Sequence, residues 1–169
     1  MMRAIFFICL LGHLISCKGQ EGKKKLYGNS EHLTFEVEID TLEGTRLAIT
    51  VSNNTKGIIY YLNPSHLDSS IPNVYKNSQK INGDEVYVPK KINSYEQALI
   101  KIDALEQHHY LTHYKLEHIF GIETEVEYEV MLAYFGKIFD SEKKEIERDF
   151  VAIGSNMVRF EFIEREDEK

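Results

Sequence analysis

The stretch LTFEVEIDTLEGTRLAITVSNN, residues 33–54, contains two runs in which apolar and polar side chains alternate. The apolar residues at every second position are Leu33, Phe35, Val37 and Ile39, then Leu47, Ile49 and Val51. A period of two is typical of a strand with one buried face, because successive side chains point to opposite faces. Glu43-Gly44 breaks the alternation. The sequence therefore predicts two strands, within 33–40 and 46–54, joined by a turn.

Similar patterns recur along the chain. They are GIIYYLN (57–63), ALIKID (98–103), EYEVMLAYF (127–135) and MVRFEFIE (157–164). Residues 64–91 hold all three prolines and many Asn, Ser and Asp residues, which predicts mostly loop, with EVYVP (85–89) as a short edge strand at best. Six or seven strands separated by turn signals indicate an all-β fold, a single antiparallel β-sandwich of about seven strands.

Residues 94–120 fit two patterns. Ser94 followed by Gln97 resembles a capping box, and Gly121 would end a helix, so one long helix and an α+β fold are an alternative. Against this helix, apolar residues alternate over 98–102 and again over 110–116, with residues 103–107 as a connection. We favour two strands and keep the helix open.

The order of these elements resembles the immunoglobulin-like accessory domains of bacterial lipoproteins. The resemblance covers residues 33–163 and lies in the turn region DALEQHHYLTHYKL (103–116), the long strand EYEVMLAYF and the Ser155-Asn156 pair before the last strand. It implies an immunoglobulin-like strand order. The buried Trp and paired Cys of antibody domains are missing, since the chain has no Trp and its two cysteines lie at positions 9 and 17.

The N-terminus has the pattern of a secretory signal, with Arg3 followed by an apolar run too short to span a membrane. At its end, Leu14-Ile15-Ser16-Cys17 resembles the lipobox of bacterial lipoproteins. This resemblance implies cleavage between Ser16 and Cys17 and a diacylglycerol on Cys17. We thus expect a signal peptide (1–16), a lipidated cysteine with a flexible tether (17–31), the β domain (32–164) and an acidic tail (165–169).

Composition restricts the chemistry of the mature chain. Cys9 leaves with the signal and Cys17 takes the lipid, so no thiol remains for disulfides, catalysis or metal binding. Without Arg3 the chain has 19 basic and 27 acidic residues, a formal charge of 19 − 27 = −8. An acidic chain is poorly suited to phosphate backbones, which makes nucleic acid a poor candidate partner. We expect no cofactor.

Four of the six histidines of the mature chain fall within residues 108–118. His109 and His113 are weak candidates for metal ligands, flanked by Glu106 and Glu117, and no third ligand can be assigned. A tyrosine- and histidine-rich strand is the favoured interpretation. Four tyrosines are candidate partner contacts, because tyrosine is enriched at interfaces, and the alternative for each is a place in the core or in cross-strand pairs. They are Tyr60, Tyr61, Tyr110 and Tyr114.

These observations predict a non-enzymatic envelope lipoprotein that binds another envelope protein as an accessory or scaffold subunit. An immunity or inhibitor protein that blocks a toxin or protease is one alternative, and a glycan-binding module is another. Lys18 after the lipidated cysteine, in place of the Asp of inner-membrane lipoproteins, favours an outer-membrane anchor, facing either the periplasm or the surface. Asp40-Thr41-Leu42 resembles an O-glycosylation motif of Bacteroidetes envelope proteins, and the Ile-, Lys-, Asn- and Tyr-rich composition suits such an organism.

Overall fold

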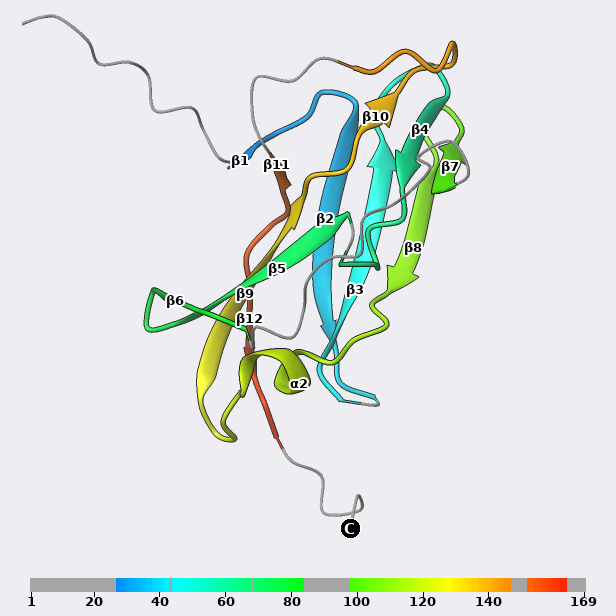
Figure 1. Cartoon of the computed structure of the whole chain (residues 1–169). Helices are drawn as coiled ribbons and strands as arrows, with labels where there is room; N and C mark the ends of the chain where they lie inside the picture. The colour runs from blue at the N-terminus through cyan, green and yellow to red at the C-terminus, as the bar shows by residue number, and fades with distance from the viewer. Residues whose placement is uncertain (1–26, 43, 68, 84–97, 147–151, 164–169) are drawn as a thin grey trace, which may run out of the picture.

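The computed structural model describes residues 27–42, 44–67, 69–83, 98–146 and 152–163 (Figure 1). Its strands are β1 (Tyr27–Gly28), β2 (Leu33–Asp40), β3 (Arg46–Asn53), β4 (Ile59–Leu62), β5 (Ser70–Lys76), β6 (Gln79–Ile81), β7 (Leu99–Ile102), β8 (Gln107–Leu111), β9 (Glu127–Tyr134), β10 (Ile138–Phe139), β11 (Ala152–Gly154) and β12 (Val158–Glu161). Helix α2 (Leu116–Phe120) is short. The predicted all-β class is confirmed, and the immunoglobulin-like strand order stays a prediction.

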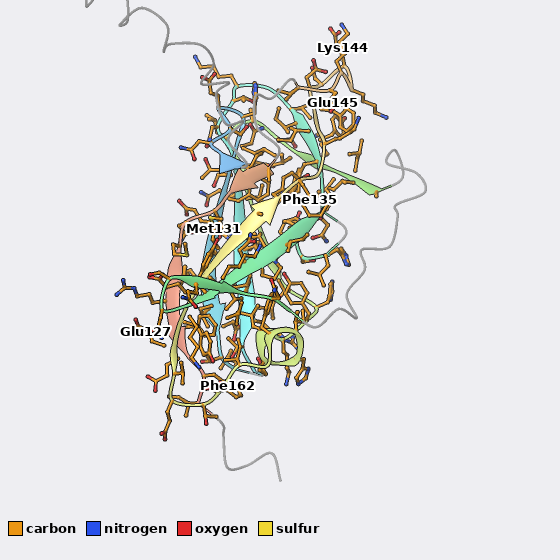
Figure 2. The ribbon with its side chains drawn as sticks, turned by 60° about the vertical axis from the view of Figure 1, so that its left-hand side comes forward. Glu127, Met131, Phe135, Lys144, Glu145 and Phe162 are labelled. Carbon is orange, nitrogen blue, oxygen red and sulfur yellow. The ribbon has the colours of Figure 1, made fainter. Side chains whose placement is uncertain are left out.

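The strands form three sheets, and all their pairs are antiparallel except β1 with β11. One sheet has the order β1-β11-β9-β5-β6, with β12 also paired to β9. The other two have the orders β2-β3-β8 and β10-β4-β7. Figure 2 follows β9 from Glu127 through Met131 to Phe135, and it places Phe162 at one end of the molecule and Lys144 and Glu145 at the other.

The hairpin predicted from residues 33–54 is confirmed, with Leu33 opposite Asn53 and Asp40 opposite Arg46. The alternating apolar side chains of β2, β3 and β9 face the core: Leu33, Phe35, Val37, Leu47, Ile49, Val51, Tyr128, Val130, Leu132 and Tyr134 are all buried. The sheets meet there, since the rings of Phe35 on β2 and Tyr134 on β9 stack with centroids 4.4 Å apart. The Tyr134 hydroxyl also accepts a hydrogen bond from the Leu62 N–H of β4, at 3.0 Å.

The prediction of mostly loop over residues 64–91 is wrong for 70–81, where β5 and β6 form. Pro72 does not prevent β5 from pairing with β9, because its partner Leu132 bonds to Ser155 instead: the Leu132 N–H donates to the Ser155 hydroxyl and the Leu132 carbonyl accepts the Ser155 N–H, both at 2.9 Å. On the β9 side, no hydrogen bond from Pro72 is therefore needed. On the other side of β5, pairing with β6 begins only at Val74, so the missing N–H of Pro72 disrupts no bond there either. The predicted strand at 85–89 lies outside the described residues.

The helix alternative for residues 94–120 is wrong over most of its length, since residues 99–111 form β7 and β8. The predicted second strand nevertheless ends early, at Leu111, and residues 116–120 are helical. The buried Thr112 explains this end, because its hydroxyl accepts the Leu47 N–H and donates to the Tyr114 carbonyl, both at 3.0 Å. The chain then turns into α2, and Gly121 ends that helix in the left-handed conformation, with φ 56°.

In the part of the chain that the structure describes, no helix has the length and apolar character needed to cross a bilayer. β1 lies toward the end of the molecule that carries β10, whereas α2 and the turn between β2 and β3 lie at the opposite end (Figure 1). The predicted signal peptide, Cys17 and the acidic tail fall outside the described residues.

Candidate functional site: tyrosines and histidines of β4 and β8

A hydroxyl and imidazole network joins β4 to β8. Tyr61 is fully buried, and its hydroxyl lies 2.9 Å from His108 Nδ1 and 2.5 Å from the Tyr110 hydroxyl. Tyr110 in turn lies 3.4 Å from the same nitrogen of His108. Since His108 and Tyr110 are two residues apart on β8, they point to the same side, toward Tyr61. We call Tyr61, His108 and Tyr110 the β4–β8 network.

Burial controls the ionisation of both tyrosines. It is the main cause of the raised pKa of Tyr61, and the hydrogen bond with Tyr110 raises that pKa further. Burial also raises the pKa of Tyr110, against the opposing effect of its hydrogen bond with Tyr61. Both hydroxyls therefore stay protonated at neutral pH. They are suited to hydrogen bonding rather than to nucleophilic or general-base chemistry.

The predicted tyrosine contacts divide into two groups. Tyr61 is fully buried and Tyr114 is 7% exposed, so both belong to the core, and their assignment as partner contacts needs correction. Tyr60 and Tyr110 are half-buried and keep part of their side chains at the surface. Lys143 Nζ lies 6.0 Å from the centroid of the Tyr60 ring, within the range of a cation–π contact.

The two candidate metal ligands have separate surroundings. His109 Nδ1 lies 3.0 Å from the Thr50 hydroxyl on β3, whereas His113 follows the end of β8 and stacks on His66, with ring centroids 4.7 Å apart. The flanking carboxylates are engaged elsewhere: Glu106 accepts the Asp103 N–H, and Glu117 accepts the Thr45 N–H. Among the described residues, no group of three or more His, Cys, Asp or Glu side chains could hold a metal ion.

Contacts across the chain tie α2 to the hairpin of β2 and β3. Both carboxylate oxygens of Glu117 lie within 3.2 Å of the Thr45 N–H, and the Leu116 N–H donates to the Thr45 carbonyl at 2.8 Å. Leu42, in the turn of that hairpin, is 76% exposed, and Thr41 beside it is exposed as well. This end of the molecule thus presents an apolar side chain on a turn whose base is held by hydrogen bonds.

Two contacts seen in the structure were missed in the sequence: the stacking of His66 on His113 and the bonding of Asn156 to Val37. His66 gave no signal, because it is a single histidine in a stretch predicted as loop. The role of Asn156 was also missed, although the Ser155-Asn156 pair was noted before the last strand: its side chain bonds to both backbone groups of Val37 on β2. No protein-family model and no curated protein matches the chain.

Proposed function

We propose that the chain is a bacterial envelope lipoprotein, held in the outer membrane by lipid on Cys17, whose β domain binds another envelope protein as a non-enzymatic accessory or scaffold subunit. The observation that carries the proposal is the Leu14-Ile15-Ser16-Cys17 tetrad at the end of an apolar run. Cys17 precedes Tyr27, the first residue of β1, by 27 − 17 = 10 positions. A tether of that length reaches about 33 Å when extended.

The position of β1 supports an orientation for the anchored domain. A lipid on Cys17 would bring the β1 end toward the membrane, so that α2 and the turn between β2 and β3 face away from it (Figure 1). That distal end carries the exposed Leu42, and the Thr45 hydrogen bonds to Glu117 and Leu116 hold its base in place. A surface that is ordered before binding loses less conformational entropy when a partner docks. The distal end is therefore the surface that we assign to the partner.

The anchor is tested by replacing each cysteine of the chain in turn. Cys17→Ser should move the protein from the membrane fraction to the soluble fraction and abolish labelling with radioactive palmitate, because two or more acyl chains supply the stable attachment. Cys9→Ser is the matched control, since Cys9 lies inside the predicted signal peptide. A Cys17→Ser chain that stays in the membrane fraction as fully as the Cys9→Ser chain contradicts the lipoprotein assignment.

The partner is tested by chemical crosslinking in intact cells, followed by purification of the full-length chain from membranes. We expect one crosslinked species whose yield falls at least fivefold in Leu42→Asp, because a charge on the distal turn opposes docking. Met157→Asp is the control, since Met157 is also exposed, at 48%, and lies just before β12. Equal yields in the two variants would remove the distal end from the proposal, and the absence of any crosslinked species would contradict the accessory role.

A further inference from the structure

His66 and His113 form an exposed pair of imidazole rings outside the β4–β8 network. His66 lies in the turn between β4 and β5, and His113 lies in the segment between β8 and α2. Their rings stack with centroids 4.7 Å apart and planes inclined by 28°. Both side chains are exposed to solvent. The fold thus brings together, at the surface, two histidines that are 113 − 66 = 47 positions apart in the sequence.

The backbone that carries His66 is held by several hydrogen bonds. The His66 carbonyl accepts the N–H groups of Ser69 and Ser70, both at 3.2 Å, and their hydroxyls at 3.2 and 3.4 Å. Ser69 and Ser70 are buried, as is Ser65 on the other side of the histidine. The turn therefore presents the His66 ring from a base that is fixed by the core.

The backbone that carries His113 is fixed by its two neighbours. Thr112 and Tyr114 are both buried, so they anchor the chain immediately before and after the exposed histidine. The Thr112 hydroxyl also accepts the Leu47 N–H and donates to the Tyr114 carbonyl. The backbone positions of both histidines are therefore set before any ligand binds, which lowers the entropic cost of binding one.

The nitrogens of the two rings are left unused by the described part of the fold. Within that part, neither the His66 ring nor the His113 ring has a hydrogen bond or an ion pair. His108 and His109 differ, since their Nδ1 atoms lie 2.9 Å and 3.0 Å from the hydroxyls of Tyr61 and Thr50. Rotation of a histidine ring about its Cβ–Cγ bond is soft, so both exposed rings can turn their nitrogens toward one ligand.

We propose that His66 and His113 form a two-histidine site for a divalent transition metal ion, of which Zn²⁺ is the representative. Imidazole nitrogen is a preferred ligand of these ions, whereas Mg²⁺ and Ca²⁺ prefer oxygen. Two nitrogens bound to one tetrahedral zinc at about 2.0–2.1 Å lie about 3.3 Å apart. Rings with centroids 4.7 Å apart reach this separation when one nitrogen of each turns toward the other.

This site differs from the one considered in the sequence. His113 is retained as a ligand, but its partner is His66 from another turn and not His109 from the same strand. The two imidazoles leave two tetrahedral positions of the zinc for water or for a donor atom of another molecule. Two protein ligands are also consistent with the lack of any group of three metal-binding side chains among the described residues.

Isothermal titration of the detergent-solubilised full-length chain with zinc chloride tests the site. We expect His66→Ala and His113→Ala each to weaken zinc binding at least tenfold, because each removes one of the two ligands. His109→Ala is the matched control, since it removes an exposed histidine of the same region and leaves the pair intact. The cysteines of the chain are the same in every variant. Magnesium chloride should give no binding to the pair. The proposal is overturned if the wild type does not bind zinc, or if the pair variants bind it as tightly as His109→Ala.

Thermal unfolding provides a second test, which also shows that the variants fold. A metal ion that binds only the folded chain raises its melting temperature. Zinc should therefore raise the melting temperature of the wild type and of His109→Ala, but not that of His66→Gln or His113→Gln, which keep a polar side chain. Without zinc, all four chains should melt alike, because the substituted side chains are exposed. An equal rise in all four chains would show that zinc binds elsewhere. Neither measurement uses the lipid anchor, so the metal site and the anchor can fail separately.

Discussion

At the scale of single residues, the side chain of Asn156 makes the two hydrogen bonds that a residue of a neighbouring strand would make with β2. Its Oδ1 accepts the Val37 N–H at 2.7 Å, and its Nδ2 donates to the Val37 carbonyl at 3.0 Å. Val37 is buried in the middle of β2, whereas Asn156 lies on the turn between β11 and β12. The amide thus joins the edge of one sheet to the β11–β12 turn of another.

Replacement of this amide should therefore lower the stability of the fold. We expect Asn156→Ala to reduce the free energy of unfolding by about 1–3 kcal/mol, because both backbone groups of Val37 lose their partner at a partly buried site. The measurement is urea denaturation followed by circular dichroism. Met157→Ala, at the exposed neighbouring position, should change the stability by less than about 0.5 kcal/mol. Similar losses in the two variants would show that the Asn156 bonds contribute little.

Sequence patterns at this scale predict which side chains share a side of a strand, but not always which side is buried. The period of two in residues 127–134 was sufficient to predict the buried side, because large apolar side chains occupy every even-numbered position and the other side begins with Glu127 and Glu129. Tyr60 and Tyr61 are adjacent and chemically identical, so nothing local distinguishes the buried one. Tyr61 and Tyr114 were therefore wrongly assigned to a contact surface, because tertiary packing decides their burial.

At the scale of elements, the end of the β2–β3 hairpin depends on a glycine. Gly44 has φ +98°, a conformation that side chains other than glycine rarely adopt. A Cβ at this position would lie 2.6 Å from Glu117 Oε1 and 2.7 Å from Lys115 Cδ. The tight approach of α2 to the hairpin, and the hydrogen bonds that Glu117 accepts from Thr45, thus require a residue without a side chain at position 44.

Gly44→Ala should destabilise the protein by at least about 1–2 kcal/mol, from backbone strain alone, and the contact with Glu117 adds to this loss. Gly57→Ala is the matched control, because its φ is ordinary and the nearest atom, Thr55 Oγ1, would be 4.0 Å away. Thermal unfolding of the three chains, followed by circular dichroism, measures the difference. If the two substitutions lower the melting temperature equally, the close approach of α2 is not a constraint.

The strands that were predicted are those with strong alternation, above all β2, β3 and β9. β5 was missed because it buries Ser70 and Asn73 and contains Pro72, three residue types that are typical of loops. The Ser70 hydroxyl donates to the Pro64 carbonyl at 2.5 Å, so the preceding turn provides the hydrogen-bond partner of this buried hydroxyl. The end of β8 was missed for a similar reason. The Thr112 N–H still donates to the Leu47 carbonyl, but the Thr112 hydroxyl, and not its carbonyl, accepts the Leu47 N–H, and Leu47 is far away in sequence.

At the scale of the whole molecule, the β4–β8 network connects two sheets. Tyr61 belongs to the β10-β4-β7 sheet, and His108 and Tyr110 belong to the β2-β3-β8 sheet. Its hydroxyls stabilise this packing only while they carry their protons. Folding raises the pKa of Tyr61 above the ordinary tyrosine value of about 10, so the folded chain holds this proton more tightly than the unfolded chain does.

This pKa shift predicts alkaline sensitivity of the global stability. The contribution of Tyr61 is fully present below about pH 10 and falls as the pH rises further, because the unfolded chain then loses a proton that the folded chain keeps. At pH 8, Tyr61→Phe should be less stable than the wild type by about 1 kcal/mol, from its lost hydrogen bonds. Between pH 8 and pH 11 that difference should shrink by up to about 1.4 kcal/mol. Urea denaturation at both pH values measures it, with Tyr60→Phe as the control that follows the wild type. A difference between wild type and Tyr61→Phe that does not change with pH would show that the Tyr61 proton is not linked to folding.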